Sequence, residues 1–96
     1  MADPRTGDFY LAESANRQIT RIDPRTSKIS AIGTGNFSVI ANCHTGDFDG
    51  MGPNGLEIVG NQIYASNGDS MVHGFSLRSD KQTAEFNTGA ACRPTR

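Results

Sequence analysis

The chain has 96 residues, of which 35% are hydrophobic and 7% aromatic, and it contains no tryptophan. A chain this short and polar forms at most one small domain with a thin core, because it buries only about 60–65% of its unfolded surface. Its formal net charge is −1, with acidic and basic residues interspersed, and no run is apolar enough for a membrane span or signal peptide. We therefore expect a soluble chain with no nucleic-acid and no membrane partner.

The first half of the chain reads as three short strands joined by turns. An apolar run at Phe9–Ala12 and a partly alternating run at Gln18–Ile22 predict a β-hairpin with its turn at Ser14–Asn16. A second turn is predicted at Asp23–Lys28, because proline presets φ and aspartate accepts a hydrogen bond from the backbone two residues on. The third strand is then expected at Ile29–Ile32.

The second half repeats this order of strands and turns. We expect an inner strand at Leu56–Val59, then strands at 63–65, 71–75 and 84–86, separated by turns at 67–69 and 78–80. At offsets of 53 or 54 residues, the two halves align Tyr10 with Tyr64, Ile19 with Val72, Ile22 with Phe75, Lys28 with Lys81 and Thr34 with Thr88. This pattern indicates an internal repeat.

The repeat divides the chain into one unit at about 1–54 and a second at about 55–96. Because Met51–Gly55 aligns with Cys92–Arg96 at a smaller offset of 41, the first unit is longer by about 13 residues, which we place in an inserted loop at 36–50. On this alignment the first and the last residue of the chain both fall at the position of Gly55.

Four short strands per unit of roughly 40–50 residues are typical of a β-propeller blade. We therefore predict an all-β fold with two four-stranded antiparallel blades. Two blades alone leave a strand edge and an apolar face in water, which natural sheets avoid. We expect three copies of the chain to close a six-bladed ring, a homotrimer of cyclic symmetry. The alternative is that the chain is a fragment of a longer propeller.

Two segments resemble known propeller repeats. The stretch 3–19, DPRTGDFYLAESANRQI, resembles the NHL-type repeat, in which a "DP-x-TG" turn leads into a "YVADSGNNRI" hairpin. Pro53–Leu56, followed by Tyr64–Asn67, resembles the "PNGLA…LYVAN" pattern of the senescence-marker-protein/gluconolactonase and strictosidine-synthase-like families. The resemblance covers most of the chain outside 36–50 and implies a six-bladed propeller. Such blades serve hydrolases, lyases and binding proteins alike.

The resemblance also implies a position for a metal ion. In gluconolactonase-like enzymes a divalent metal, usually calcium, is held at the top of the central channel by Glu, Asn and Asp residues from successive blades. Asn54 matches such a position, and Thr95 stands at the equivalent place in the second repeat. In the inserted loop, Asp47 and Asp49 are two residues apart and precede a glycine, as at the start of a calcium loop.

We take Asn54, Asp47 and Asp49 as candidate calcium ligands. The alternatives are that the asparagine caps the entry to a strand and that the two aspartates lie in a solvated acidic turn. His44, Phe37 and Phe48 also lie in the inserted loop, and we expect them at the rim of the channel, where they can contact a small molecule, a glycan or a protein.

No catalytic residue is assigned. Nothing in the sequence pairs two carboxylates at a defined distance, and the G-x-S-x-G pattern of a nucleophile elbow does not occur. We therefore expect a binding or scaffold module, with a calcium-dependent lactone hydrolase as the alternative. Cys43 and Cys92 form one disulfide in an oxidising compartment or stay as free thiols in a reducing one, so the compartment remains open and the disulfide would accompany secretion.

Overall fold

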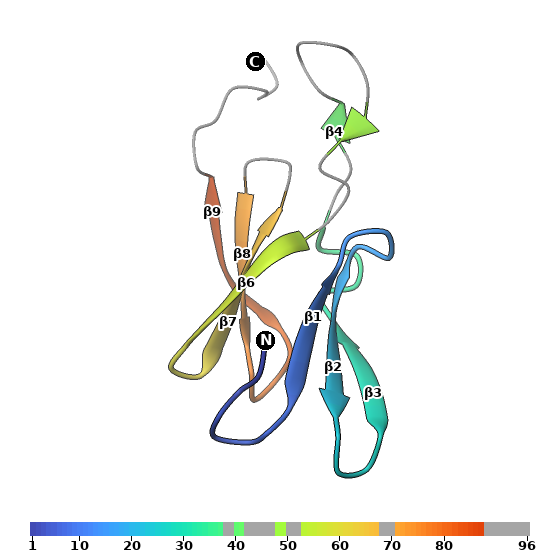
Figure 1. The fold of residues 1–96 in the computed structure, drawn as a ribbon. Coiled ribbons are helices and arrows are strands. Elements are labelled where there is room, and N and C mark those ends of the chain that lie inside the picture. Colours follow the sequence, from blue (N-terminus) through green and yellow to red (C-terminus); the bar gives the residue numbers. More distant parts are fainter. Residues whose placement is uncertain (38–39, 42–47, 50–52, 68–70, 88–96) are drawn as a thin grey trace.

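The computed structural model describes residues 1–37, 40–41, 48–49, 53–67 and 71–87; at residues 40–41, 48–49 and 54 it describes the backbone alone. Over these residues the chain is all-β, with antiparallel sheets of three and four strands and no helix (Figure 1). This confirms the predicted all-β class. No helix long and apolar enough to cross a membrane occurs in the described ranges.

The first sheet is a meander of β1 (Phe9–Glu13), β2 (Gln18–Asp23) and β3 (Lys28–Ile32). All three strands were predicted, within one residue at each end. In place of the fourth strand expected for a unit, the described part of the chain has a single bridge from Ala2 to Phe9 along the free edge of β1.

The segments 3–8 and 23–28 both begin with the tetrapeptide DPRT and form the same turn. In each, the aspartate carboxylate accepts a hydrogen bond from the backbone N–H two residues on, at 2.9 and 3.0 Å, and its carbonyl accepts one from the N–H four residues on, at 2.7 Å. That fourth residue has a positive φ, 81° at Gly7 and 62° at Ser27. Ser76 begins a third such turn, in which its hydroxyl replaces the carboxylate.

The second sheet is a four-stranded meander in which sequential strands are neighbours. It comprises β6 (Pro53–Val59), β7 (Gln62–Asn67), β8 (Met71–Ser76) and β9 (Gln82–Asn87). The register of β6 shifts between Pro53 and Gly55, and the pairing of β8 with β9 shifts at Gly74. The inserted loop contains a short pair that the sequence did not indicate, β4 (Ile40–Ala41) with β5 (Phe48–Asp49).

The strand register follows the internal repeat. Tyr10 pairs with Arg21 in the first sheet, and Tyr64 pairs with Gly74 in the second. The offset drops from 54 to 53 at the β7–β8 connection, because that connection is one residue shorter than the β1–β2 connection. It returns to 54 at the bulge in β9, where Thr83 is the extra residue.

The alignment of Met1 with Gly55 is wrong by two residues. Met1 and Tyr10 exchange two backbone hydrogen bonds, both of 2.7 Å, as an antiparallel pair. The corresponding partner of Tyr64 is Glu57, so Met1 takes the place of Glu57. The difference arises because the DPRT turn leading into β1 is two residues longer than the turn between β6 and β7.

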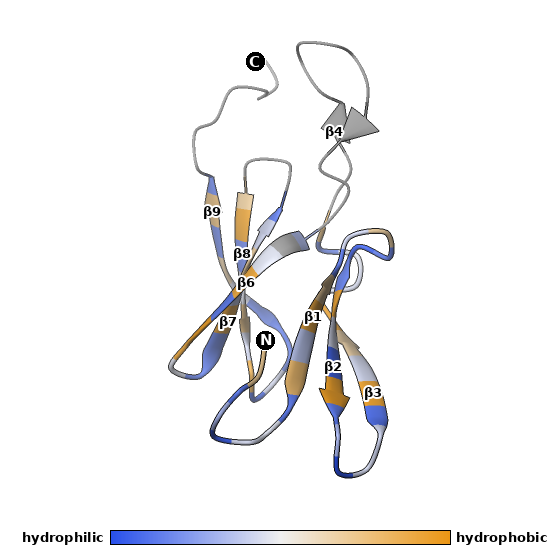
Figure 2. Ribbon diagram, viewed as in Figure 1, coloured by the Kyte–Doolittle hydropathy of each residue, from blue (hydrophilic) through white to orange (hydrophobic). Residues whose placement is uncertain are grey.

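The core lies between the two sheets (Figure 1). Its buried side chains are Tyr10, Ile19 and Ile32 of the first sheet, Ile63, Ala65 and Phe75 of the second, and Phe37. Figure 2 shows hydrophobic residues interspersed with polar ones along the strands, whereas most turns are hydrophilic. We call the face of each sheet that contacts this core its inner face and the opposite face its outer face.

The two sheets stack face to back. Tyr10, Ile19 and Ile32 are on the inner face of the first sheet. Their repeat equivalents in the second sheet are on its outer face, because cross-strand partners share a face and successive residues alternate between faces. These equivalents are Tyr64, Val72 and Phe86. The second sheet therefore contacts the first sheet through its inner face. The equivalent face of the first sheet is that sheet's outer face.

Candidate functional site

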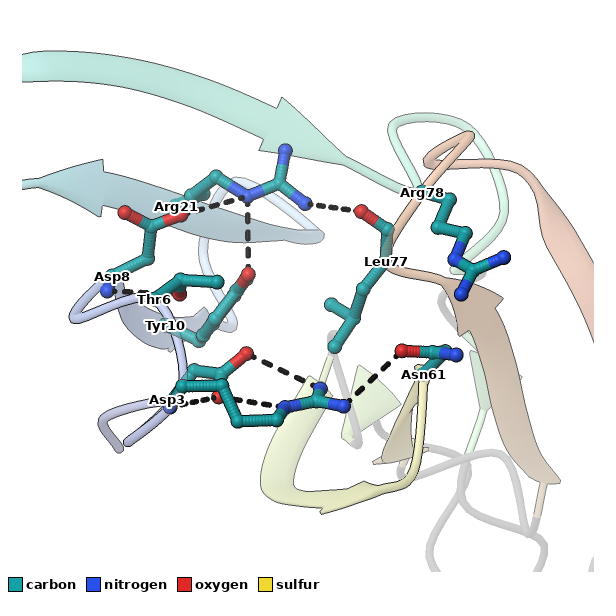
Figure 3. Close-up of a pocket in the computed structure, with 9 residues that line it drawn as sticks. Asp3, Thr6, Asp8, Tyr10, Arg21, Asn61, Leu77 and Arg78 are labelled. Carbon is teal, nitrogen blue, oxygen red and sulfur yellow. Dashed lines mark hydrogen bonds and ion pairs between the residues drawn. The ribbon is translucent and has the colours of Figure 1, made fainter.

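A pocket of about 460 Å³ opens between the two sheets, at the end where their turns meet (Figure 3). Its walls come from four separate places in the chain: residues in the segment 3–10, Arg21 of β2, Asn61 in the β6–β7 turn, and Leu77 and Arg78 after β8. Since both sheets contribute, the pocket exists only when they are packed together.

Arg21 occupies the centre of this arrangement. Its guanidinium donates two hydrogen bonds to the Asp80 carboxylate, at 2.8 and 3.0 Å, one to the Tyr10 hydroxyl at 3.2 Å and one to the Leu77 carbonyl at 3.4 Å. It also lies 5.4 Å from the centre of the Tyr10 ring. The hydrogen bonds to Asp80 and then to Tyr10 raise the pKa of Arg21, so this side chain stays charged and links the sheets.

Asp3 and Arg5 form a second link between the sheets. The Asp3 carboxylate accepts hydrogen bonds from the Arg5 side chain at 3.3 and 3.4 Å, and Arg5 also donates to the Asn61 side chain at 3.1 Å. Asp3 is 1% exposed. The hydrogen bonds from the Arg5 side chain and backbone hold the pKa of Asp3 below its ordinary value of 3.8.

Asp8 and Arg78 retain binding capacity in the pocket. The Asp8 carboxylate is 3.9 Å from both Arg21 and Arg25, and its Oδ1 has no hydrogen-bond partner within the described chain. The guanidinium of Arg78 is exposed and makes no hydrogen bond or ion pair with another described residue (Figure 3). The pocket therefore offers the exposed guanidinium of Arg78 to a small polar molecule, beside a buried Asp8 oxygen that lacks a hydrogen bond.

His73 lies apart from the pocket, buried at the inner face of the second sheet. Its Nδ1 is 2.9 Å from Gln82 Oε1 and 3.5 Å from Glu85 Oε2, and its ring contacts the Phe37 ring edge to face, with the centres 4.9 Å apart. Its Nε2 is buried without a hydrogen-bond partner among the described residues. These contacts give His73 a structural place in the second sheet, away from the pocket.

Phe37 is not at a rim, where the sequence analysis expected it. It is 3% exposed and packs against His73 and Phe75, with its ring centre 5.6 Å from that of Phe75. The physical reason is the turn after β3, in which Asn36 N–H donates to the Gly33 carbonyl at 2.8 Å and brings Phe37 into the core. No sequence pattern distinguished Phe37 from an exposed loop aromatic.

The other predicted site residues lie where the structure describes only the backbone or nothing. Asn54 is in β6 at the register shift, and Phe48 and Asp49 form β5. His44, Asp47, Cys43 and Cys92 lie outside the described residues. Within the described residues no three His, Cys, Asp or Glu side chains gather as a metal site would require. The calcium ligands and the other rim residues therefore stay predictions.

The pocket could not be predicted from the sequence, because its residues come from four separate segments of the chain. The one available signal was the repeated DPRT tetrapeptide, which fixes the turn but does not reveal what Arg5 contacts. The chain matches no protein-family model, and no curated protein or solved structure is detectably similar to it.

Proposed function

We propose that the chain is a binding or scaffold module of the β-propeller type, in which the three-stranded and the four-stranded sheet are two successive blades. The observation that carries this proposal is the face-to-back stacking of two sheets with matching register. Propeller blades repeat around a central axis, so each blade presents one face to the blade before it and the opposite face to the blade after it.

Three copies of the chain would complete a ring of six blades. A pair of sheets stacked face to back leaves one outer face uncovered at each end. Each added copy covers one such face but brings an uncovered face of its own, so all outer faces are covered only when the assembly closes into a ring. A cyclic trimer meets this condition, and in it the inserted loop 36–50 would occur three times around the channel.

Binding is favoured over catalysis because most charged groups of the inter-sheet pocket already have partners. Arg21, Arg5 and Asp3 are held by the contacts that join the sheets. The Arg78 guanidinium remains for a ligand, and its positive charge suits a small molecule with acceptor groups. A glycan or a protein segment at the inserted loop is the other ligand class that we propose.

Sedimentation equilibrium of the purified chain tests the architecture. The expected mass is about 31 kDa, three times the chain mass of 10.3 kDa, with no change over a hundredfold range of concentration. A chain that stays folded at 10.3 kDa throughout that range would overturn the proposal.

A further inference from the structure

We propose that the partner of the two outer faces is a second copy of this chain, bound head to tail: the outer face of the second sheet docks on the outer face of the first sheet of the next copy. This inference rests on the proposed function and specifies its contact surfaces. It predicts one directional interface that is used repeatedly.

The exposure of repeat-equivalent residues supports these surfaces. Ile63 and Ala65 are fully buried on the inner face of the second sheet, whereas their equivalents Phe9 and Leu11 on the outer face of the first sheet are each 46% exposed. The same contrast separates Ile32, which is 1% exposed, from its equivalent Phe86 on the second sheet, which is 53% exposed. Apolar positions that the internal interface buries are thus left open on the outer faces.

The exposed apolar surface is concentrated on these two faces. Apart from Met1, the large hydrophobic side chains that are strongly exposed in the described chain all belong to them: Phe9, Leu11 and Ile29 on the first sheet, and Val59 and Phe86 on the second. This gathering on two faces differs from the singly scattered exposed hydrophobic residues that are normal on a protein surface.

The internal interface serves as the template for the external one. In it, the face of the first sheet that carries Tyr10 packs on the face of the second sheet that carries Ile63 and Phe75. By register, the outer face that carries Tyr64 can pack in the same way on the outer face that carries Phe9 and Ile22. The new contact would therefore extend the stacking already present within the chain.

Local shape on the second sheet also suits an incoming side chain. A hollow of about 270 Å³ opens on its outer face beside Tyr64, where the small residues Gly55 and Ser66 stand next to Val72. Gly74 makes room for the Tyr64 ring, since a Cβ there would lie 2.7 Å from a ring carbon. The hollow can accept an apolar side chain such as Leu11 of the next copy.

Two charge substitutions test the direction of this interface. Leu11→Glu places a carboxylate on the outer face of the first sheet, and Phe86→Glu places one on the outer face of the second. Both side chains are about half exposed within the chain, so each variant should fold. Its melting temperature should be close to that of the wild-type chain in the same oligomeric state. Ser79→Glu adds the same charge in an exposed turn away from both faces and is the control.

Each variant alone should sediment at 10.3 kDa, because either substitution spoils one partner of every contact. A 1:1 mixture should give a heterodimer of about 21 kDa, since the intact second sheet of the Leu11→Glu chain can bind the intact first sheet of the Phe86→Glu chain. A mixture that stays monomeric would exclude head-to-tail contact. Variants that keep the wild-type mass would also exclude it, because an assembly of that mass would then be held by other surfaces.

The wild-type mass separates this inference from the proposed function. A series of masses that grows with concentration, together with the heterodimer in the mixture, would show that the faces bind as proposed but that the ring of six blades does not close. A folded wild-type monomer would contradict both the head-to-tail contact and the ring. It would favour the alternative that the chain is part of a longer propeller whose own blades cover the two faces.

Discussion

Arg21 of the first sheet binds Asp80 of the second sheet's last turn through both carboxylate oxygens, at 2.8 and 3.0 Å, although the two residues are 59 positions apart in the chain. The same guanidinium contacts the hydroxyl and the ring of Tyr10. A single side chain thus joins a strand, a turn and the edge of the core, and it lines the inter-sheet pocket.

Arg21→Ala should lower the free energy of unfolding by about 1.5–3 kcal/mol, the usual loss for hydrogen bonds to a charged partner. Arg21→Lys should recover little of it, because an ammonium group cannot donate to both carboxylate oxygens in the planar geometry of a guanidinium. Urea unfolding with a double-mutant cycle against Asp80→Asn measures the coupling. Arg25→Ala is the control, since Arg25 is largely exposed and its hydrogen bonds stay within its own turn, and an equal loss in the two alanine variants would contradict the assigned link.

Stability should fall in acid because of the two DPRT aspartates. The pKa of Asp3 and that of Asp23 are lowered by hydrogen bonds from Arg5 and Arg25, so near the ordinary value of 3.8 the unfolded chain binds more protons than the folded one. The stabilisation is complete well above 3.8 and is lost as the pH falls through the folded-state values.

Asp3→Asn should flatten this pH dependence more than Asp23→Asn. The Asp3 carboxylate is buried, and its arginine also binds Asn61 of the second sheet, whereas the Asp23 turn is exposed. Urea unfolding between pH 3 and pH 6 measures the slopes. Identical slopes for the wild type and both variants would show that these carboxylates do not govern the acid limb.

Gly33→Ala should destabilise the fold more than Gly35→Ala. Both glycines have a positive φ, of 78° and 86°, so each substitution carries a backbone cost of about 1–2 kcal/mol. At Gly33 the new Cβ would also lie 2.8 Å from ring carbons of Phe37 and Phe75, whereas at Gly35 it would meet nothing within 4 Å. Thermal melting compares the pair, and an equal shift would contradict the burial of Phe37 against this turn.

Calcium should leave the melting temperature unchanged if the chain is a binding module. In a symmetric ring each copy would offer the same Asn54, without the acidic ligand that the resemblance to lactonases requires at matched positions. Melting at millimolar calcium and in chelator measures the effect, because a ligand that binds only the native state must raise its stability. A rise that disappears in Asn54→Ala would favour the calcium-dependent hydrolase instead.

The strands and turns could be predicted from the sequence because their causes are local. Short apolar and β-branched runs between turn residues define the strands, and the aspartate and proline of DPRT form the same turn twice through contacts two to four residues apart. The repeat was also visible, because equivalent strands need similar residues at similar spacing. The Met1 alignment failed by two residues because a turn can lengthen without changing the strands on either side.

The low content of hydrophobic and aromatic residues implies a thin core for a chain of this length, and that conclusion follows from the sequence alone. The tertiary structure decided which faces meet: Tyr10 and Ile32 are covered, whereas Tyr64 and Phe86 face outward at equivalent positions. It also decided that Phe37 is buried and that Arg21 reaches Asp80. Alternation along a strand assigns residues to two faces, but only the packing of one sheet on another determines which of the two is buried.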